Sequence, residues 1–199
     1  MLKQTAGSWR DARRQSARAA LLTTAWQMVR ESGLASLSLR ELARRAGTTT
    51  PTVYAYFESK HAIFDAMFAE AAESFESMRA EPPDLGDPHA NLVADTQRFV
   101  EFCTSDVARY HLLFQHSIPG FRPSAAAYAP AVRALDLLRG YLRRNGVTEG
   151  RHLDIWTALT TGLVDQQISN DPGGDRWSRL IDEAVEMFLA HCSTERRPS

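Results

Sequence analysis

The most informative stretch of this sequence is residues 38–60, SLRELARRAGTTTPTVYAYFESK, which contains two short helical patterns on either side of Gly47. The first pattern has apolar residues at helical spacing, namely Leu39, Leu42, Ala43 and Ala46. Gly47 ends this pattern, because glycine adopts the positive φ of a helix stop without a Cβ penalty. Thr48 or Thr49 can cap the second helix, whose first turn carries Pro51. The stretch therefore predicts a helix-turn-helix.

The second helix of this pair has an apolar side and a side of short polar residues. We expect Val53, Tyr54 and Phe57 to face inward. The outward side carries Thr50, Thr52, Ala55 and Tyr56. Short side chains let a helix lie deep in the major groove of DNA, where hydroxyls contact phosphates or base edges. An ordinary helical hairpin is the simpler alternative, and the arginines on either side favour a nucleic-acid partner.

Polar residues at the expected helix starts predict several side-chain caps. Ser38 and Glu41 have the three-residue spacing of a capping box. Ser59 and Asp87 stand before two further apolar helical stripes, and Pro88 suits a first helical turn.

The periodicity is helical along nearly the whole chain, with no convincing strand and no internal repeat. An earlier helix ends at Gly33, and a long one is expected from about 124 to 145. In the long helix we expect an inward stripe of Tyr128, Val132, Leu135, Leu138 and Leu142. The predicted fold class is all-α, with about nine helices.

The composition is that of a globular protein, with 44% apolar and 24% charged residues in 199. No apolar run approaches the ~20 residues of a membrane-spanning helix, so no membrane partner is expected. The two cysteines, Cys103 and Cys192, are far apart and make no zinc or disulfide pattern, which fits a cytoplasmic protein.

The charge is unevenly distributed along the chain. Residues 1–60 contain ten Lys and Arg and four Asp and Glu, a balance of +6, whereas the remainder has a balance of −7. This division suggests a basic module that meets a polyanion and an acidic body with another task.

Residues 21–68 resemble the DNA-binding domain of the TetR family of transcriptional regulators. The resemblance is carried by the apolar helix ending at Gly33, by SLRELA at 38–43, by Ala46-Gly47, and above all by PTVYAYFESK at 51–60. Pro51 replaces a glycine that is usual in the family, a variant that the family also shows. The resemblance implies a three-helix DNA-binding domain at 1–60 and a helical ligand-binding and dimerisation domain at 61–199.

The resemblance also implies roles for individual residues. Those expected to contact DNA are Ser38, Arg40, Thr49, Thr50, Thr52, Tyr54, Tyr56 and Lys60. For Tyr54 we expect a packed ring with its hydroxyl on DNA. An N-terminal basic arm, with Arg10, Arg13, Arg14 and Arg18, is expected to attract phosphates without sequence preference. For Arg44 and Arg45 a solvated helix face is favoured over direct contact.

The middle helices, roughly 87–145, would surround a small-molecule site in this family. The candidate ligand-binding residues are Phe99, Cys103, Phe114, His116 and Trp156, with Phe102, Tyr110 and Tyr128 as further aromatic candidates. Plain core packing is the alternative for each of them. The spacing of His111 and His116 does not put both on one helical face, so no metal site and no cofactor are expected.

A single helix-turn-helix reads few base pairs, so useful specificity needs two copies on a palindromic operator. The resemblance implies a homodimer through the last two helices. These helices carry more apolar surface than one short helix pair needs, so their apolar residues are expected in the interface or in the core, namely Trp156, Leu159, Leu163, Val164, Ala184, Val185 and Phe188. The predicted function is a repressor of transcription that an unidentified small-molecule effector releases from double-stranded DNA. A helical sensor or adaptor that binds a protein is the alternative. No enzyme motif is present.

Overall fold

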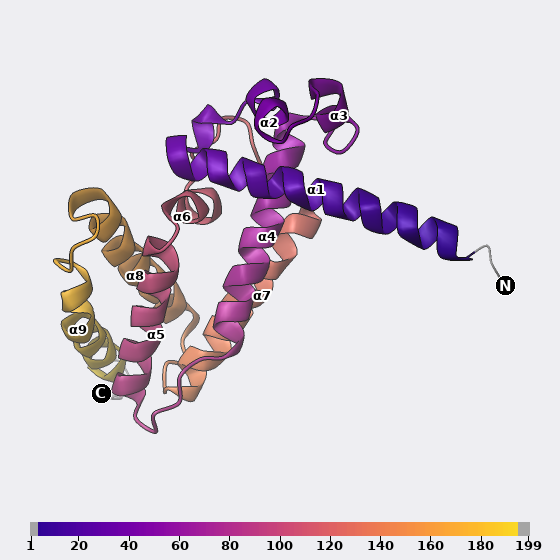
Figure 1. Ribbon diagram of the computed structural model, residues 1–199. Coiled ribbons are helices and arrows are strands. Elements are labelled where there is room, and N and C mark those ends of the chain that lie inside the picture. Colours follow the sequence, from indigo (N-terminus) through magenta and orange to yellow (C-terminus); the bar gives the residue numbers. More distant parts are fainter. Residues whose placement is uncertain (1–3, 195–199) are drawn as a thin grey trace. The chain divides into compact units, whose positions relative to one another are not determined.

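The computed structural model describes the backbone of residues 4–194 and the side chains of residues 9–194, and within that range it contains nine α-helices and no strand (Figure 1). The elements are α1 (Gln4–Ser32), η1 (Leu34–Ser36), α2 (Leu39–Arg45), α3 (Thr50–Tyr54), α4 (Lys60–Ala80), α5 (Pro88–Thr104), α6 (Val107–Phe114), α7 (Ala125–Arg144), α8 (Gly150–Asn170), η2 (Ser178–Leu180) and α9 (Ile181–Thr194), where η marks a 3-10 turn. The all-α prediction is confirmed.

Contacts between residues divide the chain into two compact units. The first comprises Met1–Ala71 and His111–Tyr128, and the second comprises Ala72–Tyr110 and Ala129–Ser199. The helices α4, α6 and α7 each contribute residues to both units. The division into domains at residues 1–60 and 61–199 stays a prediction about function.

The first unit contains the predicted helix-turn-helix. The second half of α1 packs against α2 and η1, and α2 packs against α3. Trp26 of α1 donates its indole N–H to the Glu70 carboxylate of α4 over 2.8 Å, which links these helices. Gly33 ends α1 with a φ of 80°, as predicted.

Three of the four predicted caps are present. Thr49 Oγ1 accepts from the Thr52 amide, Ser59 Oγ from the Ala62 amide, and Asp87 Oδ2 from the Ala90 amide. The Ser38–Glu41 capping box is wrong: Ser38 is the N-cap of α2, but its side chain makes no capping hydrogen bond. The Glu41 carboxylate instead accepts hydrogen bonds from two guanidinium groups one turn later, those of Arg44 and Arg45.

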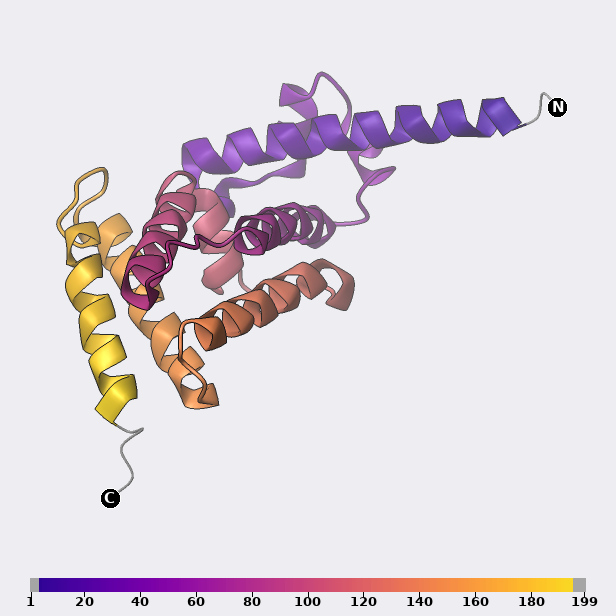
Figure 2. The same cartoon turned by 90° about the horizontal axis from the view of Figure 1, so that it is seen from below.

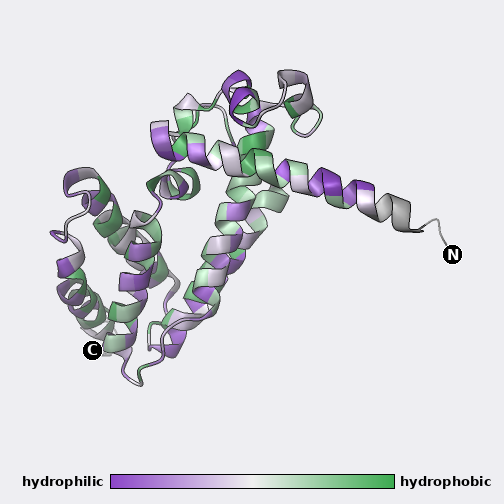
Figure 3. Ribbon diagram, viewed as in Figure 1, coloured by the Kyte–Doolittle hydropathy of each residue, from purple (hydrophilic) through white to green (hydrophobic). Residues whose placement is uncertain are grey.

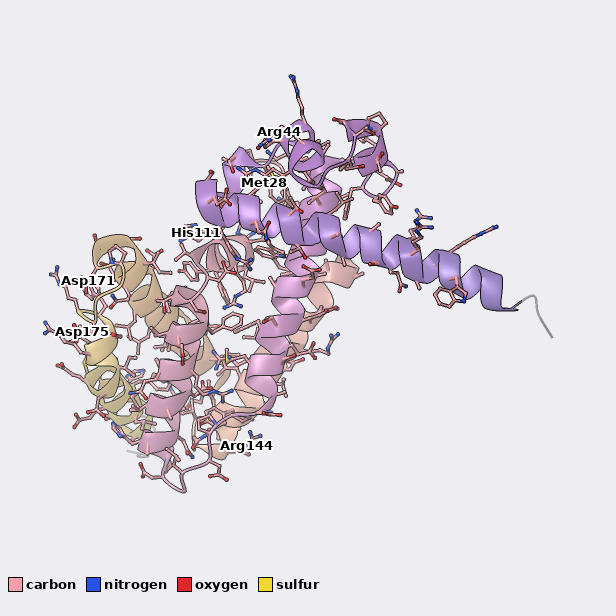
Figure 4. All side chains as sticks on the ribbon, in the orientation of Figure 1. Met28, Arg44, His111, Arg144, Asp171 and Asp175 are labelled. Carbon is pink, nitrogen blue, oxygen red and sulfur yellow. The ribbon has the colours of Figure 1, made fainter. Side chains whose placement is uncertain are left out.

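The second unit is organised around α5, which packs against both α8 and α9, while α8 and α9 also contact each other (Figure 2). One buried polar side chain, that of Gln167, ties its elements together. Gln167 of α8 accepts from the Trp177 and Ser178 amides and donates to the Gly174 carbonyl. Asp171 and Asp175, labelled in Figure 4, stand in the same α8–α9 connection.

Of the five residues expected to face inward on α7, three do not. Leu138 and Leu142 are buried, but Tyr128, Val132 and Leu135 are exposed. The buried side of α7 also includes Ala127, Ala134 and Tyr141. Alanines allow close approach of neighbouring helices but carry little weight in a hydropathy pattern, so the larger side chains misled the prediction.

Among residues 4–194, no helix combines the length and the apolar character needed to cross a membrane.

Candidate nucleic-acid interface

The turn between α2 and α3 has the geometry that its sequence predicts. Gly47 adopts a φ of 65°, and the Thr48 amide donates to the Ala43 carbonyl over 2.9 Å, which closes the end of α2. Leu42, Ala43 and Val53 are buried between the two helices. This small core holds α3 in place and leaves its other side free.

The start of α3 is fixed by Thr49. Its hydroxyl oxygen accepts from the Thr52 amide over 3.4 Å and lies 2.9 Å from the Thr52 hydroxyl. Pro51 occupies the first turn, where a missing N–H costs nothing. Two exposed hydroxyls thus stand together at the start of α3.

The residues predicted to contact DNA are mostly accessible. Those exposed are Ser38, Arg40, Thr49, Thr52 and Tyr54, while Thr50, Tyr56 and Lys60 are half-buried. Lys60 already has an acceptor, since its ammonium group lies 3.4 Å from the Ala35 carbonyl. Their contacts with DNA stay predictions.

The expectation of a packed Tyr54 ring is wrong, because its side chain is 51% exposed. Phe57 and Val53 fill the inner side of this segment, and Tyr56 is the tyrosine that is partly covered. In a helix of only five residues that side has room for few large groups.

Arg44 and Arg45 are occupied within the protein, in agreement with their expected place on a solvated helix face. Both donate to Glu41, and Arg45 also binds Glu31. The hydrogen bonds from Arg44 and then Arg45 lower the pKa of the Glu41 carboxyl to about 2. Arg40, which is exposed beside them, is therefore the α2 arginine available to a ligand.

The predicted ligand-binding residues do not gather in one place. Phe99, Cys103 and Trp156 are buried in the packed interior of the second unit. Burial raises the pKa of the Cys103 thiol to about 12. Phe114 and His116 belong to the first unit, where His116 lines a cavity.

This cavity of about 560 Å³ lies entirely within the first unit. It is lined by Phe68, Leu112, Leu113, Gln115, His116, Ile118, Phe121, Arg122, Pro123, Ala125 and Tyr128. In the sequence, residues 118–123, IPGFRP, read only as a break between two helical patterns. Two large apolar side chains in so short a loop, Ile118 and Phe121, were the signal that could have identified it.

The loop that lines the cavity, residues 118–124, contacts the first turns of α4 through ring packing and hydrogen bonds. The Phe121 ring lies 5.8 Å from the Phe64 ring and 5.9 Å from the His61 ring, measured between centroids. The Ser124 amide and hydroxyl both donate to the Asp65 carboxylate, over 2.6 and 2.9 Å. Because α4 begins directly after the helix-turn-helix, the cavity and the candidate DNA-binding surface share one helix.

Among the described residues 9–194, no group of three His, Cys, Asp or Glu side chains is arranged to hold a metal ion.

Comparison with known proteins decides the family. Residues 21–67 match the model for the N-terminal domain of the bacterial regulatory proteins, tetR family. The tetracycline repressor protein class C of Escherichia coli is 31% identical over 165 residues, which cover 80% of this chain and 70% of that protein. The chain belongs to the TetR family.

Solved structures agree with the TetR fold at lower sequence identity. A tetR-family transcriptional regulator from Streptomyces coelicolor superposes with a TM-score of 0.72 at 19% identity, over 91% of this chain and 83% of that one. AibR, in complex with isovaleryl coenzyme A and operator DNA, gives a TM-score of 0.63 at 18% identity, over 86% and 97%. This TetR-family protein is a DNA-binding transcriptional regulator and not an enzyme.

Proposed function

We propose that this regulator is a repressor that binds a palindromic operator as a homodimer, inserts α3 into the major groove, and is released by a small molecule. The observation that carries the proposal is the exposed row of short polar side chains on α3, Thr49 and Thr52 with Tyr54, above the buried Val53. Bulky side chains on that face would keep the helix out of the groove.

We assign a role to each residue from the length and the exposure of its side chain. Thr49, Thr50 and Thr52 would meet base edges or phosphates, and Arg40 is long enough for either. Ser38, Tyr54, Tyr56 and Lys60 would contact the phosphate backbone on both sides of α3. The exposed Tyr54 phenol supports this role better than a packed ring would.

The dimer surface is proposed on the outer sides of α8 and α9. Trp156, Val164, Val185 and Phe188 are buried within one chain, so these four belong to the core. The accessible apolar and small residues are Ile155, Ala158 and Gly162 on α8 with Met187 on α9, and Leu159, Leu163 and Ala184 are partly exposed beside them. Two copies joined there would present two α3 helices to half-sites about 34–36 Å apart.

The effector site is proposed in the cavity of the first unit. A volume of about 560 Å³ is in the usual range for a small-molecule site, and most of its lining is apolar. Arg122 and His116 are its exposed basic side chains. These features favour an apolar molecule with one anionic group. AibR, which shares the fold, was solved with isovaleryl coenzyme A.

Release would act through α4. A ligand that moves the loop at Phe121 and Ser124 would shift the first turns of α4, because Phe121 packs against Phe64 and Ser124 donates to Asp65. Only a difference in ligand affinity between the two conformations can drive this change. In the dimer, a change of a few ångströms in the separation of the α3 helices would prevent both from docking.

Selection of bound duplexes from a random pool tests the DNA-binding proposal. We expect one enriched palindrome, whose symmetry and spacing report the dimer. Thr52→Val keeps the volume and the backbone amide that Thr49 caps but removes a hydroxyl, and should weaken the selected duplex about 5- to 100-fold, at ~1–3 kcal/mol per base contact. The proposal would be contradicted if no sequence is enriched. It would also be contradicted if both Thr52→Val and Arg40→Ala bind the selected duplex as tightly as the parent.

The effector proposal is tested with a panel of carboxylic acids of increasing chain length. A fitting acid should raise the melting temperature and lower affinity for the selected duplex, and Arg122→Ala should weaken acid binding but not DNA binding. Arg139→Ala, which changes an arginine of the second unit, is the control. Saturating acid with unchanged operator affinity would rule out the release mechanism.

The adaptor alternative gives a different result in a salt titration with arbitrary duplex. A DNA-binding protein loses affinity steeply as salt rises, whereas an adaptor shows no such binding. A cytoplasmic location is part of the proposal, because operator DNA lies there.

A further inference from the structure

Residues 9–20 of α1 are almost entirely exposed to solvent. From Leu21 onward α1 has a buried side, and Met28, labelled in Figure 4, is in that packed half. In residues 9–20, WRDARRQSARAA, every side chain is exposed except the half-buried Ala17. We call residues 9–20 the arm. Figure 3 shows it as a mainly hydrophilic extension of α1.

The arm has a charge pattern that costs stability in the free protein. It contains four arginines and one aspartate. Arg10, Arg14 and Arg18 follow one another at i, i+4 spacing, where like charges destabilise a helix by a few tenths of a kcal/mol per pair. Alanines at 12, 17, 19 and 20 keep the segment helical despite this repulsion. An external anion would convert the repulsion into attraction.

The arginine row lies on the side of α1 that faces α3. The Arg18 guanidinium lies 4.9 Å from the centre of the Phe57 ring, just beyond the end of α3. Residues three and four apart share a helix face, so Arg14 and Arg10 extend this side by one and two turns toward the N-terminus. At 1.5 Å per residue, the row extends about 12 Å along the helix from Arg18 to Arg10.

Several other arginines in the described part of the chain have carboxylate partners. Arg44, Arg45, Arg79 and Arg133 bind carboxylates within the protein. No acceptor in the described residues binds Arg10, Arg13 or Arg14, so their donors are available to an outside partner.

We propose that the arm binds the phosphate backbone of double-stranded DNA outside the half-site contacted by α3. This inference rests on the proposed function and extends it, because it makes the sequence flanking the operator part of the binding site. The arm contributes affinity that depends on salt and not on sequence, since guanidinium–phosphate contacts carry no base information.

The test compares the selected duplex trimmed to its palindrome with the same palindrome carrying about one helical turn, ~10 base pairs, of arbitrary sequence at each end. The parent protein should bind the flanked duplex more tightly. The triple variant Arg10→Ala, Arg13→Ala, Arg14→Ala should bind both duplexes equally. Three lost phosphate contacts lower the salt slope by about 2.7 per chain, so between 50 and 200 mM salt the variant should lose about 40-fold less affinity per chain than the parent.

The control is a triple variant with the same loss of charge, in which the exposed Arg143, Arg144 and Arg176 of the second unit become alanine. It should keep the flank effect. If the control variant loses as much of the flank effect as the arm variant does, net charge alone explains the result and the proposal is overturned. Alanine favours helix at exposed sites, so the arm variant should fold, which circular dichroism checks.

The proposal and the proposed function fail separately. Without an enriched duplex, the function itself fails. Suppose instead that a duplex is enriched, that the parent protein binds its trimmed and flanked forms equally well, and that the arm variant has the same salt slope as the parent. In that case only the arm proposal fails. If the arm variant keeps the flank effect but no longer sediments with phosphatidylserine vesicles, the arm binds membranes, and the arm proposal is overturned in that case as well.

Discussion

Arg79 and Asp95 form a buried ion pair in the second unit, with their charged atoms 2.5 Å apart and their side chains 5% and 2% exposed. The guanidinium also lies over the Phe75 and Phe99 rings. Its Nε–H has no acceptor in the described structure, so the pair carries part of its desolvation cost uncompensated. Each partner stabilises the fold mainly by neutralising the buried charge of the other.

Removing one partner should therefore lower the free energy of unfolding far more than replacing both. We expect Asp95→Ala to lower the free energy of unfolding by about 3–5 kcal/mol, because it leaves a buried guanidinium unpaired. The double variant Arg79→Met, Asp95→Leu should recover much of that loss. Urea denaturation measures both, and Asp182→Ala, at an exposed carboxylate, is the control. Equal losses in the single and double variants would contradict this account.

Cys103 is fully buried, and its pKa of about 12 is a consequence of that burial. We expect iodoacetamide at pH 8 to leave it unlabelled in the folded protein and to label it in urea, as read by mass spectrometry. Since the folded pKa is raised above the ordinary thiol value of 9.0, this thiol stabilises the fold below pH 9 and loses that contribution as pH rises toward 12. Rapid native labelling would contradict the burial.

At the scale of elements, caps and connections decide where each helix begins. The caps at Thr49, Ser59 and Asp87 were predictable, because a short polar side chain finds its acceptor or donor within four residues. The Ser38–Glu41 box was not, since Glu41 could choose between a backbone amide and two guanidiniums. Charge-assisted bonds to Arg44 and Arg45 are the stronger choice.

The connection between α8 and α9 depends on Gln167. We expect Gln167→Ala to lower the free energy of unfolding by at least about 2 kcal/mol, because it leaves the Trp177 and Ser178 amides without an acceptor. Hydrogen exchange at those two amides should accelerate. Gln166→Ala, one residue away on the exposed side, should change neither quantity by much. Similar effects of the two variants would remove this role from Gln167.

At the scale of the whole molecule, the proposed assembly places Gly162 in the dimer interface. Within one chain, a Cβ built on Gly162 meets nothing within 4 Å. We expect Gly162→Arg to fold but to run as a monomer in sedimentation, and to bind the selected duplex weakly. Gly162→Ala should keep the dimer and gain about 0.5–1 kcal/mol of helix stability.

Gly150 is equally open within one chain and lies at the start of α8. Gly150→Arg is therefore the matched control and should remain dimeric. A Gly162→Arg protein that stays dimeric would move the interface away from this side of α8.

The sequence by itself determined the all-α fold, the helix-turn-helix at residues 38–60 and the polar outer side of α3. These features depend on neighbours within about seven residues, where period, caps and glycine stops act directly. The family resemblance rests on the same local stretch and extends no residue roles into the second unit.

Only the tertiary structure decided which large side chains of α7 to α9 are core and which are accessible. Val132 and Trp156 look alike in a hydropathy pattern, yet one is 47% exposed and the other 1%. It also brought Phe68, Phe121 and Tyr128 around one cavity, although they lie on three separate segments. Burial and cavities depend on which distant segments meet, and that information is not contained in the period of any single helix.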